Sequence, residues 1–188
     1  MGPTATERDH VIETERLLLR KPELADAAAV LDLTTDPVAM EFLGGVHPNA
    51  ADDPEFVVRR WLERWDGNGC GPFSIVRRAD GRWLGRCGVL VWDVRTWTHT
   101  TFSTAGGFAQ PELGWLLGRE HWGRGYATEA ALALRDWAFA ERGLTRLISL
   151  IEPSNVRSQR LAERLGCTAG ETIELSDNGP HVVWTHPA

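Results

Sequence analysis

With 188 residues, 43% of them hydrophobic and 24% charged, the chain has the size and composition of one soluble globular domain. Its net charge of −6 argues against a nucleic-acid partner. No apolar run approaches the roughly 18 residues of a membrane-spanning helix, so we expect no membrane partner.

The N-terminal segment lacks the apolar core of a secretory signal. We therefore expect a flexible arm over residues 1–13, followed by one folded domain over residues 14–188. The first element of that domain is a strand over residues 15–21, where leucines alternate with charged residues and Pro22 ends the pattern.

Apolar residues at helical spacing then predict three helices before residue 66. Asp36 followed by Pro37 is typical of a helix start, and Asp52 or Asp53 is expected to cap the third helix. The three helices are expected over residues 22–33, 37–42 and 54–65.

After the glycine-rich turn at residues 67–71 the pattern changes to strands, and Asp80-Gly81 is a strong signal for a β-hairpin. The polar, threonine-rich residues 95–110 predict a long loop. No repeat or linker divides the chain, so we expect a single α/β domain. The remaining expected elements are strands over 73–77, 83–92, 111–117, 144–151, 167–174 and 181–185, and helices over 128–142 and 155–165.

The cysteines and histidines favour neither a disulfide nor a metal site. Cys70, Cys87 and Cys167 are odd in number, far apart and without a CxxC pair, and no two histidines stand four residues apart. Reduced thiols are typical of a cytoplasmic protein. Lys21 is the single lysine, so we do not expect catalysis through a lysine Schiff base.

A glycine-rich segment joins the strand over 111–117 to the helix over 128–142; it reads Trp122-Gly123-Arg124-Gly125-Tyr126-Ala127. Glycines leave the unpaired N–H groups of a helix start open to close approach, and the helix dipole favours an anion there, ideally a phosphate. Plain turn chemistry is the alternative. The segment matches neither a P-loop, which needs GxxxxGK[ST], nor a complete dinucleotide fingerprint.

A second motif, NxxSxxLxExLG, begins at Asn155 and ends at Gly166. Together with WGRGYATEA it resembles the GCN5-related N-acetyltransferase (GNAT) superfamily and, within it, the RimJ/RimL-like group of ribosomal-protein N-terminal acetyltransferases. The resemblance runs from Thr14-Glu15-Arg16-Leu17 to the end of the chain. The superfamily's phosphate loop reads [Q/R]-x-x-G-x-[G/A]; Trp122 departs from its first position, where a bulky residue is familiar in this group.

The resemblance implies an α/β (α+β) GNAT fold with a mixed, mostly antiparallel central sheet and helices on both faces. The sheet is expected to splay after its fourth strand, which ends at Leu117. The strands that end at Leu117 and Ile151 are expected to run parallel because a helix crosses between them.

The resemblance also implies acetyl-CoA as co-substrate and no metal. Backbone N–H groups of residues 124–128 are expected to hold the pyrophosphate, and residues 115–117 to pair with pantetheine like an added strand, with an N–H near Leu117 as an oxyanion hole. Arginines near both motifs form either a basic rim for phosphates or an ordinary soluble surface; they are Arg119, Arg124, Arg157 and Arg160. The implied cofactor-binding residues are Trp115, Leu116, Leu117, Trp122, Gly123, Arg124, Gly125, Tyr126, Ala127, Thr128, Asn155 and Ser158.

Two residues are candidates for proton transfer. Glu112, on the central strand, is the candidate base, directly or through a water; an ordinary strand glutamate facing solvent is the alternative. Many superfamily members carry a tyrosine where this chain has Ala162, so Ser158 is the candidate donor to the leaving sulfur. Asn155 would hold pantetheine or a water, unless Asn155 and Ser158 are plain helix-cap residues.

The sequence thus predicts an N-acetyltransferase that transfers an acetyl group from acetyl-CoA to a primary amine by direct attack in a ternary complex. The sequence leaves two identities for the acceptor, a protein N-terminal α-amine and a small-molecule amine. It is also compatible with a homodimer. Acidic residues between 41 and 66 and four tryptophans are candidate contacts for the acceptor. The alternatives are that the acidic residues form an ordinary solvated surface and that the tryptophans pack in the core. A catalytically silent acetyl-CoA sensor or scaffold is the alternative function.

Overall fold

The computed structural model describes residues 10–44 and 53–187. Within them, nine strands form one sheet in the order β1-β2-β3-β4-β6-β7-β9-β8, and β5 pairs with β4 beside this path. The strands are β1 Ile12–Glu13, β2 Leu17–Arg20, β3 Pro72–Arg77, β4 Trp83–Asp93, β5 Thr98–His99, β6 Ala109–Leu117, β7 Ile148–Ile151, β8 Thr168–Leu175 and β9 Gly179–Thr185. The helices are α1 Ala27–Thr35, α2 Phe56–Asn68, α3 Phe102–Ala105, α4 Tyr126–Ala140 and α5 Val156–Arg164, with short 3₁₀ turns at Leu24–Asp26, Gly106–Phe108 and Arg119–His121.

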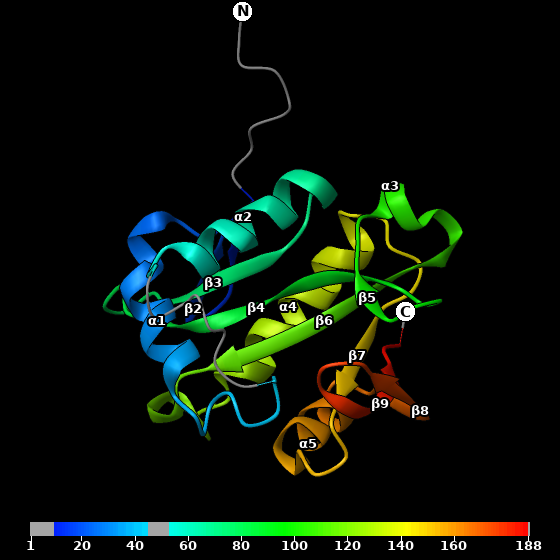
Figure 1. The fold of residues 1–188 in the computed structure, drawn as a ribbon. Coiled ribbons are helices and arrows are strands. Elements are labelled where there is room, and N and C mark those ends of the chain that lie inside the picture. The colour runs from blue at the N-terminus through cyan, green and yellow to red at the C-terminus, as the bar shows by residue number, and fades with distance from the viewer. Residues whose placement is uncertain (1–9, 45–52, 188) are drawn as a thin grey trace, which may run out of the picture.

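The sheet is mixed and mostly antiparallel, as predicted. Only β6 and β7 run parallel, and they are in register at a single pair, Glu112 with Ile148. Beyond that pair the two strands diverge toward their C-terminal ends (Figure 1). The predicted parallel pair and the splay of the sheet are therefore confirmed.

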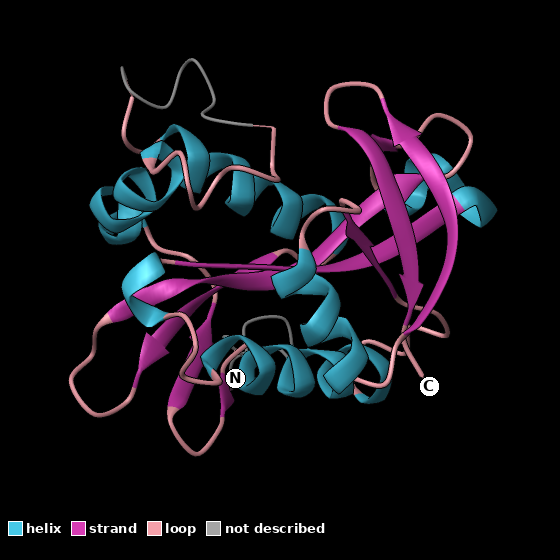
Figure 2. Ribbon diagram, turned by 90° about the horizontal axis from the view of Figure 1, so that it is seen from below, coloured by secondary structure: helices cyan, strands magenta, loops and turns pink. Residues whose placement is uncertain are grey.

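Helices cover both faces of the sheet (Figure 2). The α1–α2 pair lies on one face, and α4 lies on the other, where it packs mainly against β4 and β6. Successive side chains of β6 point to opposite faces of the sheet. Leu113 and Leu117 belong to the core under α4, whereas Leu116 packs against Leu33 of α1.

The sequence of α4 explains its position. Its apolar residues recur at intervals of three and four, so one face can be buried along its whole length. The buried residues of α4 are Tyr126, Ala130, Ala131, Leu134, Trp137 and Ala138. On the opposite side of this core lie the fully buried Phe73 of β3 and Leu113 of β6. This packing fixes the N-terminus of α4 beside the splay of β6 and β7.

Three sequence predictions are wrong in detail. Residues 37–42 form turns rather than a helix, although the Asp36 carboxylate accepts the N–H groups of Val38 and Ala39 as a helix N-cap does; the same carboxylate also binds Arg119. The predicted loop over 95–110 contains β5, α3 and the start of β6. The strand predicted from residue 144 begins at Ile148.

Strand β1 lies within the segment that the sequence predicts as an arm, where it pairs with β2. Of the two residues expected to cap the third helix, Asp52 lies outside the described residues. Asp53 accepts the Glu55 N–H with its side chain, and the helix itself starts at Phe56.

Candidate active site

A cavity of about 1140 Å³ opens where β6 and β7 diverge. It is bordered by β6, by the N-terminal ends of α4 and α5, and by residues 38–43 after α1. It therefore reaches both faces of the sheet through one gap. Arg124 is the one predicted site residue that does not line it. The other twelve do: Glu112, Trp115, Leu116, Leu117, Trp122, Gly123, Gly125, Tyr126, Ala127, Thr128, Asn155 and Ser158.

The N-terminus of α4 presents unpaired N–H groups to this cavity. The helix has no side-chain cap, and its first backbone hydrogen bond runs from Glu129 N–H to Gly125 O at 3.0 Å. The N–H groups of Tyr126, Ala127 and Thr128 thus precede the intrahelical ladder. Gly123, with φ of +70°, has open space within 4 Å of the position a Cβ would take. The cradle is free of side chains and suits an anion.

An ion pair ties this loop to the first strands of the sheet. Arg16 Nε lies 2.6 Å from Glu129 Oε2, and Arg16 Nη1 donates to the Arg124 carbonyl at 2.9 Å. Thr14 Oγ1 donates to the other Glu129 oxygen at 2.6 Å. The one acidic residue in the first turn of α4 is thereby paired with a cation. The sequence alone assigns Thr14 and Arg16 no role beyond the family resemblance.

Backbone groups of β6 face the splay at alternate residues. Gly118 N–H donates to Leu84 O, and hydrogen-bonded residues alternate along an antiparallel pair. The backbone groups of Leu116 therefore bond to β4, whereas those of Trp115 and Leu117 point toward the gap. Leu117 O accepts the Trp122 indole N–H at 2.8 Å. Leu116 instead contributes its side chain to the cavity.

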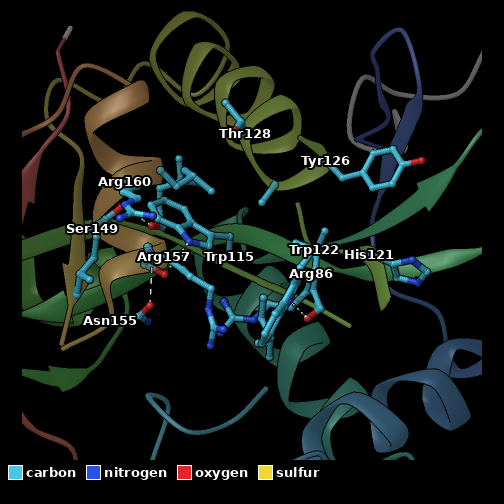
Figure 3. Close-up of a pocket in the computed structure, with 18 of the residues that line it drawn as sticks. Arg86, Trp115, His121, Trp122, Tyr126, Thr128, Ser149, Asn155, Arg157 and Arg160 are labelled. Atoms are coloured by element: carbon cyan, nitrogen blue, oxygen red, sulfur yellow. Dashed lines mark hydrogen bonds between the residues drawn. The ribbon is translucent and has the colours of Figure 1, made fainter. Parts of the chain in front are cut away.

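Ser158 lies inside the cavity in contact with Trp115. The Trp115 indole N–H donates to Ser158 Oγ at 3.2 Å, which leaves the hydroxyl hydrogen available for a third group. Asn155 Oδ1 accepts the Ser158 backbone N–H at 3.1 Å and caps α5. Figure 3 shows Trp115 between Asn155 on one side and Thr128 of α4 on the other. The cap role of Asn155 and the cavity position of Ser158 therefore coexist.

Tyr126, the single tyrosine of the chain, does not reach this group. Its ring points away from Trp115 and Asn155 (Figure 3), and the Arg16 guanidinium lies 4.7 Å from its centre. The Tyr126 side chain is buried against the first strands. Ser158, which lies beside Trp115 in the cavity, therefore stays the candidate hydroxyl donor in place of a tyrosine.

Glu112 is buried, so the expectation of a solvent-facing strand glutamate is wrong. Its Oε2 atom accepts the Trp92 indole N–H at 2.6 Å. Burial raises the pKa of Glu112, and Trp92 and Arg86 oppose this only in part. Glu112 belongs to the single residue pair between β6 and β7, and its side chain lies on the face of the sheet that α1 and α2 cover. A raised pKa makes the ionised Glu112 a stronger proton acceptor than an ordinary carboxylate.

The predicted basic rim is present in part. Arg157 and Arg160 line the cavity, and the Arg157 guanidinium lies 4.1 Å from the centre of the Trp122 ring. Arg164 lines it too, although the sequence analysis does not name it. Arg119 is held by Asp36 at 2.7 Å and is not at the cavity.

Arg86 is a cavity residue that sequence reasoning missed. It is the one charged residue before Asp93 in the otherwise apolar strand β4, and this departure from the pattern is the signal that could have found it. Three acidic candidates for acceptor contacts are paired elsewhere: Asp53 and Glu55 with Arg59, and Asp66 at 3.5 Å from Lys21. Of the candidate tryptophans, Trp92 donates to the cavity residue Glu112. Within residues 10–44 and 53–187, no three His, Cys, Asp or Glu side chains are grouped to hold a metal.

Comparisons with known proteins identify the class. Residues 16–168 match the family described as an acetyltransferase (GNAT) domain, so the chain belongs to the GNAT family of acetyltransferases. It is 32% identical over 162 residues to the uncharacterized protein YkkB of Bacillus subtilis, covering 85% of this chain and 86% of that protein. The structure of an acetyltransferase from Agrobacterium tumefaciens superposes with a TM-score of 0.77 and 30% identity over the whole of both chains.

Two more distant structures share the fold alone. RimL, a ribosomal L7/L12 α-N-protein acetyltransferase, superposes with a TM-score of 0.71 at 15% identity, covering 98% of each chain. The aminoglycoside acetyltransferase AAC(6')-Ib, solved with coenzyme A, superposes with a TM-score of 0.70 at 19% identity over 90% of this chain and 94% of that one. The protein is thus an acyltransferase of the GNAT fold. The names of these two relatives also indicate that the fold does not fix the acceptor.

Proposed function

We propose that the protein transfers an acetyl group from acetyl-CoA to a primary amine by direct attack in a ternary complex. The observation that carries the proposal is the cavity at the β6–β7 splay, which joins an anion cradle on one face of the sheet to a buried carboxyl on the other. Two substrates can enter such a cavity from opposite faces and meet in the gap without a covalent enzyme intermediate.

The cradle at the N-terminus of α4 is the proposed site for the coenzyme A pyrophosphate, with Arg157 and Arg160 as basic neighbours. The free backbone edge at Trp115 and Leu117 is the proposed site for the amides of pantetheine. The residues fit the group because no side chain fills the cradle and no strand pairs with that edge. An N–H near Leu117 is also placed to stabilise charge on the acetyl carbonyl oxygen.

In the proposed transfer, a bond forms between the amine nitrogen and the acetyl carbon, and the bond from that carbon to sulfur breaks. Glu112 accepts the proton that the amine loses, directly or through a water. Ser158 gives its hydroxyl proton to the departing sulfur as the carbon–sulfur bond breaks, which yields the free thiol, and regains a proton from solvent. An α-amino group has a pKa of roughly 8, so on the order of a tenth is neutral at pH 7 and a weak base suffices.

Turnover tests the proposal directly. The protein is incubated with acetyl-CoA and a panel of peptides, amino acids and small amines, and free thiol and acetylated product are measured by a colorimetric reagent and mass spectrometry. We expect thiol release that depends on an amine and equals the product formed. Acetyl-CoA binding without turnover on any amine would contradict the proposal and favour a catalytically silent sensor or scaffold.

The finer expectations of the sequence belong to the same proposal. We place the protein in the RimJ/RimL-like group and in the cytoplasm, and a peptide panel together with cell fractionation tests both. Three cysteines without a disulfide agree with a reducing compartment. No helix in the described part of the chain has the length and apolar character to cross a membrane. A homodimer stays open to measurement of mass in solution.

A further inference from the structure

Arg86 and Glu112 stand next to each other on the acceptor side of the cavity without forming an ion pair. Residues directly opposite on β4 and β6 share a face, so Arg86, Glu112 and Gly114 all point toward α1 and α2. The position of a Gly114 Cβ would be 3.1 Å from Arg86 Nη1 and 3.6 Å from Glu112 Oε1. The two charged groups therefore lie close to the same point over Gly114.

The Arg86 guanidinium has no anionic partner among the described residues. No salt bridge within 4.0 Å joins it to a carboxylate there, and its buried Nη1 atom has no hydrogen-bond acceptor. Glu112 accepts the Trp92 indole N–H with Oε2, and the Leu150 backbone also bonds to the Glu112 carboxyl. An arginine taken from water without a partner costs free energy, which an anion bound against it would offset.

The surroundings add positive charge rather than cancel it. Arg64 of α2 lies near enough that burial, together with the charges of Arg86 and Arg60, lowers the pKa of Arg64 to about 10. Arg60 has a carboxylate neighbour in Glu63, at 3.5 Å. Glu112 is the one acidic residue of the cavity on this face, so the Arg86 and Arg64 pair leaves an excess of positive charge.

The other cavity residues on this side are apolar. They come from the turn after α1 and from β6, and include Val38, Ala39, Phe42 and Leu116. The remaining charged residues of the cavity belong to the start of β2, to α4, or to the segment from Glu152 through α5. Arg86 and Glu112 are thus an isolated pair of opposite charges, farther apart than an ion pair, in an apolar compartment.

We propose that the acceptor is a small amine that carries its own carboxylate, of the α-amino acid type. Its carboxylate binds the Arg86 guanidinium, and its amine lies at Glu112, where it loses its proton before attack. Both protein groups flank the same point over Gly114, so the amine and the carboxylate of the acceptor must be only a few atoms apart. This inference rests on the proposed function, and it names the substrate class of the same site.

The test compares L-amino acids with their own carboxamides as acceptors, since each carboxamide keeps the amine and side chain but lacks the negative charge. The assay measures kcat and KM by thiol release. We expect the wild type to favour the carboxylate form by about 10- to 100-fold in kcat/KM. The carboxamide amine is less basic and is neutral to a larger extent at pH 7, which biases the comparison against this result.

Arg86→Met should raise KM for the carboxylate acceptors by about 10- to 100-fold relative to their carboxamides, so that the preference disappears. The ratio is the readout because Arg86 also lowers the pKa of Glu112, and its loss changes kcat for both forms. Arg86→Lys keeps the charge and guards against a misfolded variant; it should retain part of the preference. Arg78→Met, at a half-exposed arginine that pairs with Glu13 outside the cavity, is the matched control. Acetyl-CoA affinity should be the same in all four proteins.

The outcomes separate the two proposals. Equal use of carboxylates and carboxamides by the wild type, or an unchanged preference in a folded Arg86→Met variant, would overturn this inference and leave the proposed function standing. No thiol release with any amine would overturn the proposed function, and this inference with it.

Discussion

Arg16 binds Glu129 with both its side chain and its backbone. Arg16 Nε donates to Glu129 Oε2 at 2.6 Å, and the Arg16 N–H donates to Oε1 at 2.9 Å. The same guanidinium donates to the Arg124 carbonyl, in the loop that precedes α4. Residues more than a hundred positions apart thus fix the anion cradle against the first strands of the sheet.

The first prediction concerns this contact. Arg16→Met should weaken acetyl-CoA binding by about 3- to 10-fold, because one loop-positioning hydrogen bond of about 1 kcal/mol is lost. Isothermal titration of acetyl-CoA measures the effect. Arg59→Met is the control, since it removes a similarly exposed arginine that also binds two oxygens of acidic residues. Equal affinity in wild type and Arg16→Met would contradict the positioning role.

The same contact has a pH dependence. Burial alone would raise the pKa of Glu129, but hydrogen bonds from Thr14 and Arg16 bring it below its ordinary value of 4.5. A lowered folded-state pKa gives stability that is present above 4.5 and is lost as pH falls through the folded value. Thermal melts from pH 7 to pH 3 should therefore show less acid destabilisation in Glu129→Gln than in wild type.

The second prediction concerns the anion cradle. Gly123 and Gly143 both have positive φ, +70° and +64°, and both have open space around the position of a Cβ. Leucine at either position should cost about 1 to 2 kcal/mol of stability through backbone strain. Only Gly123→Leu should also abolish the rise in Tm that acetyl-CoA causes, because its side chain occupies the cradle.

Gly143→Leu is thus a matched control for strain, since it lies after α4 and outside the cavity. We expect Gly125→Leu to abolish the shift as well, but a Cβ there would lie 3.2 Å from Arg16 Nη2 and disturb that residue too. A normal acetyl-CoA shift in folded Gly123→Leu would refute the placement of the pyrophosphate.

How much of this site the sequence predicts depends on how local each feature is. The glycine loop and the Asn155 cap depend on neighbouring residues, so their motifs mark them without a structure. The α4 helix has a long apolar period and lies within two residues of its predicted bounds at each end. Such features follow from residues that are close in the chain.

Other features depend on register or on distant partners. The proximity of Arg86 and Glu112 follows from the pairing of Leu90 with Glu112, and a shift of one residue would place Arg86 on the other face. Asp36 carries a good helix-start signal, yet Arg119 from a distant segment binds its carboxylate and turns replace the helix. No local pattern contains this information.

The third prediction concerns Glu112. Burial raises its pKa above the ordinary 4.5, so the native state binds more protons than the unfolded state between 4.5 and the raised value. Stability therefore falls as pH rises through that window, and the ionised form costs stability above it. Glu112→Gln should raise the Tm at pH 8 more than at pH 5.

As a base, Glu112 works only when ionised, so the wild-type rate should rise with pH through its raised pKa. Glu112→Gln should lower kcat by about 10- to 100-fold and remove this rise of the rate with pH. Glu174→Gln, on the exposed face of β8, is the control. A variant with the wild-type rate at every pH would show that the amine loses its proton to solvent.

The last prediction concerns Ser158. Its Oγ accepts the Trp115 indole N–H, so its hydroxyl hydrogen is free to stabilise a departing thiolate. Ser158→Ala should lower kcat by about 10- to 100-fold, at or below the bottom of the range for general acids, because a serine hydroxyl is a weak acid. Acetyl-CoA affinity should stay nearly unchanged, since the contact matters mainly in the transition state.

Trp115→Phe provides the background that separates this role from a packing effect. In that variant no indole N–H is left without an acceptor when Ser158 becomes alanine, so a further loss of kcat reports the hydroxyl alone. Stopped-flow measurement of thiol release with saturating acceptor gives the rate, and titration gives the affinity. Weaker acetyl-CoA binding with kcat preserved would make Ser158 a ground-state contact, with solvent protonating the thiolate. Wild-type values for both would reduce it to a helix residue that accepts the Trp115 hydrogen bond.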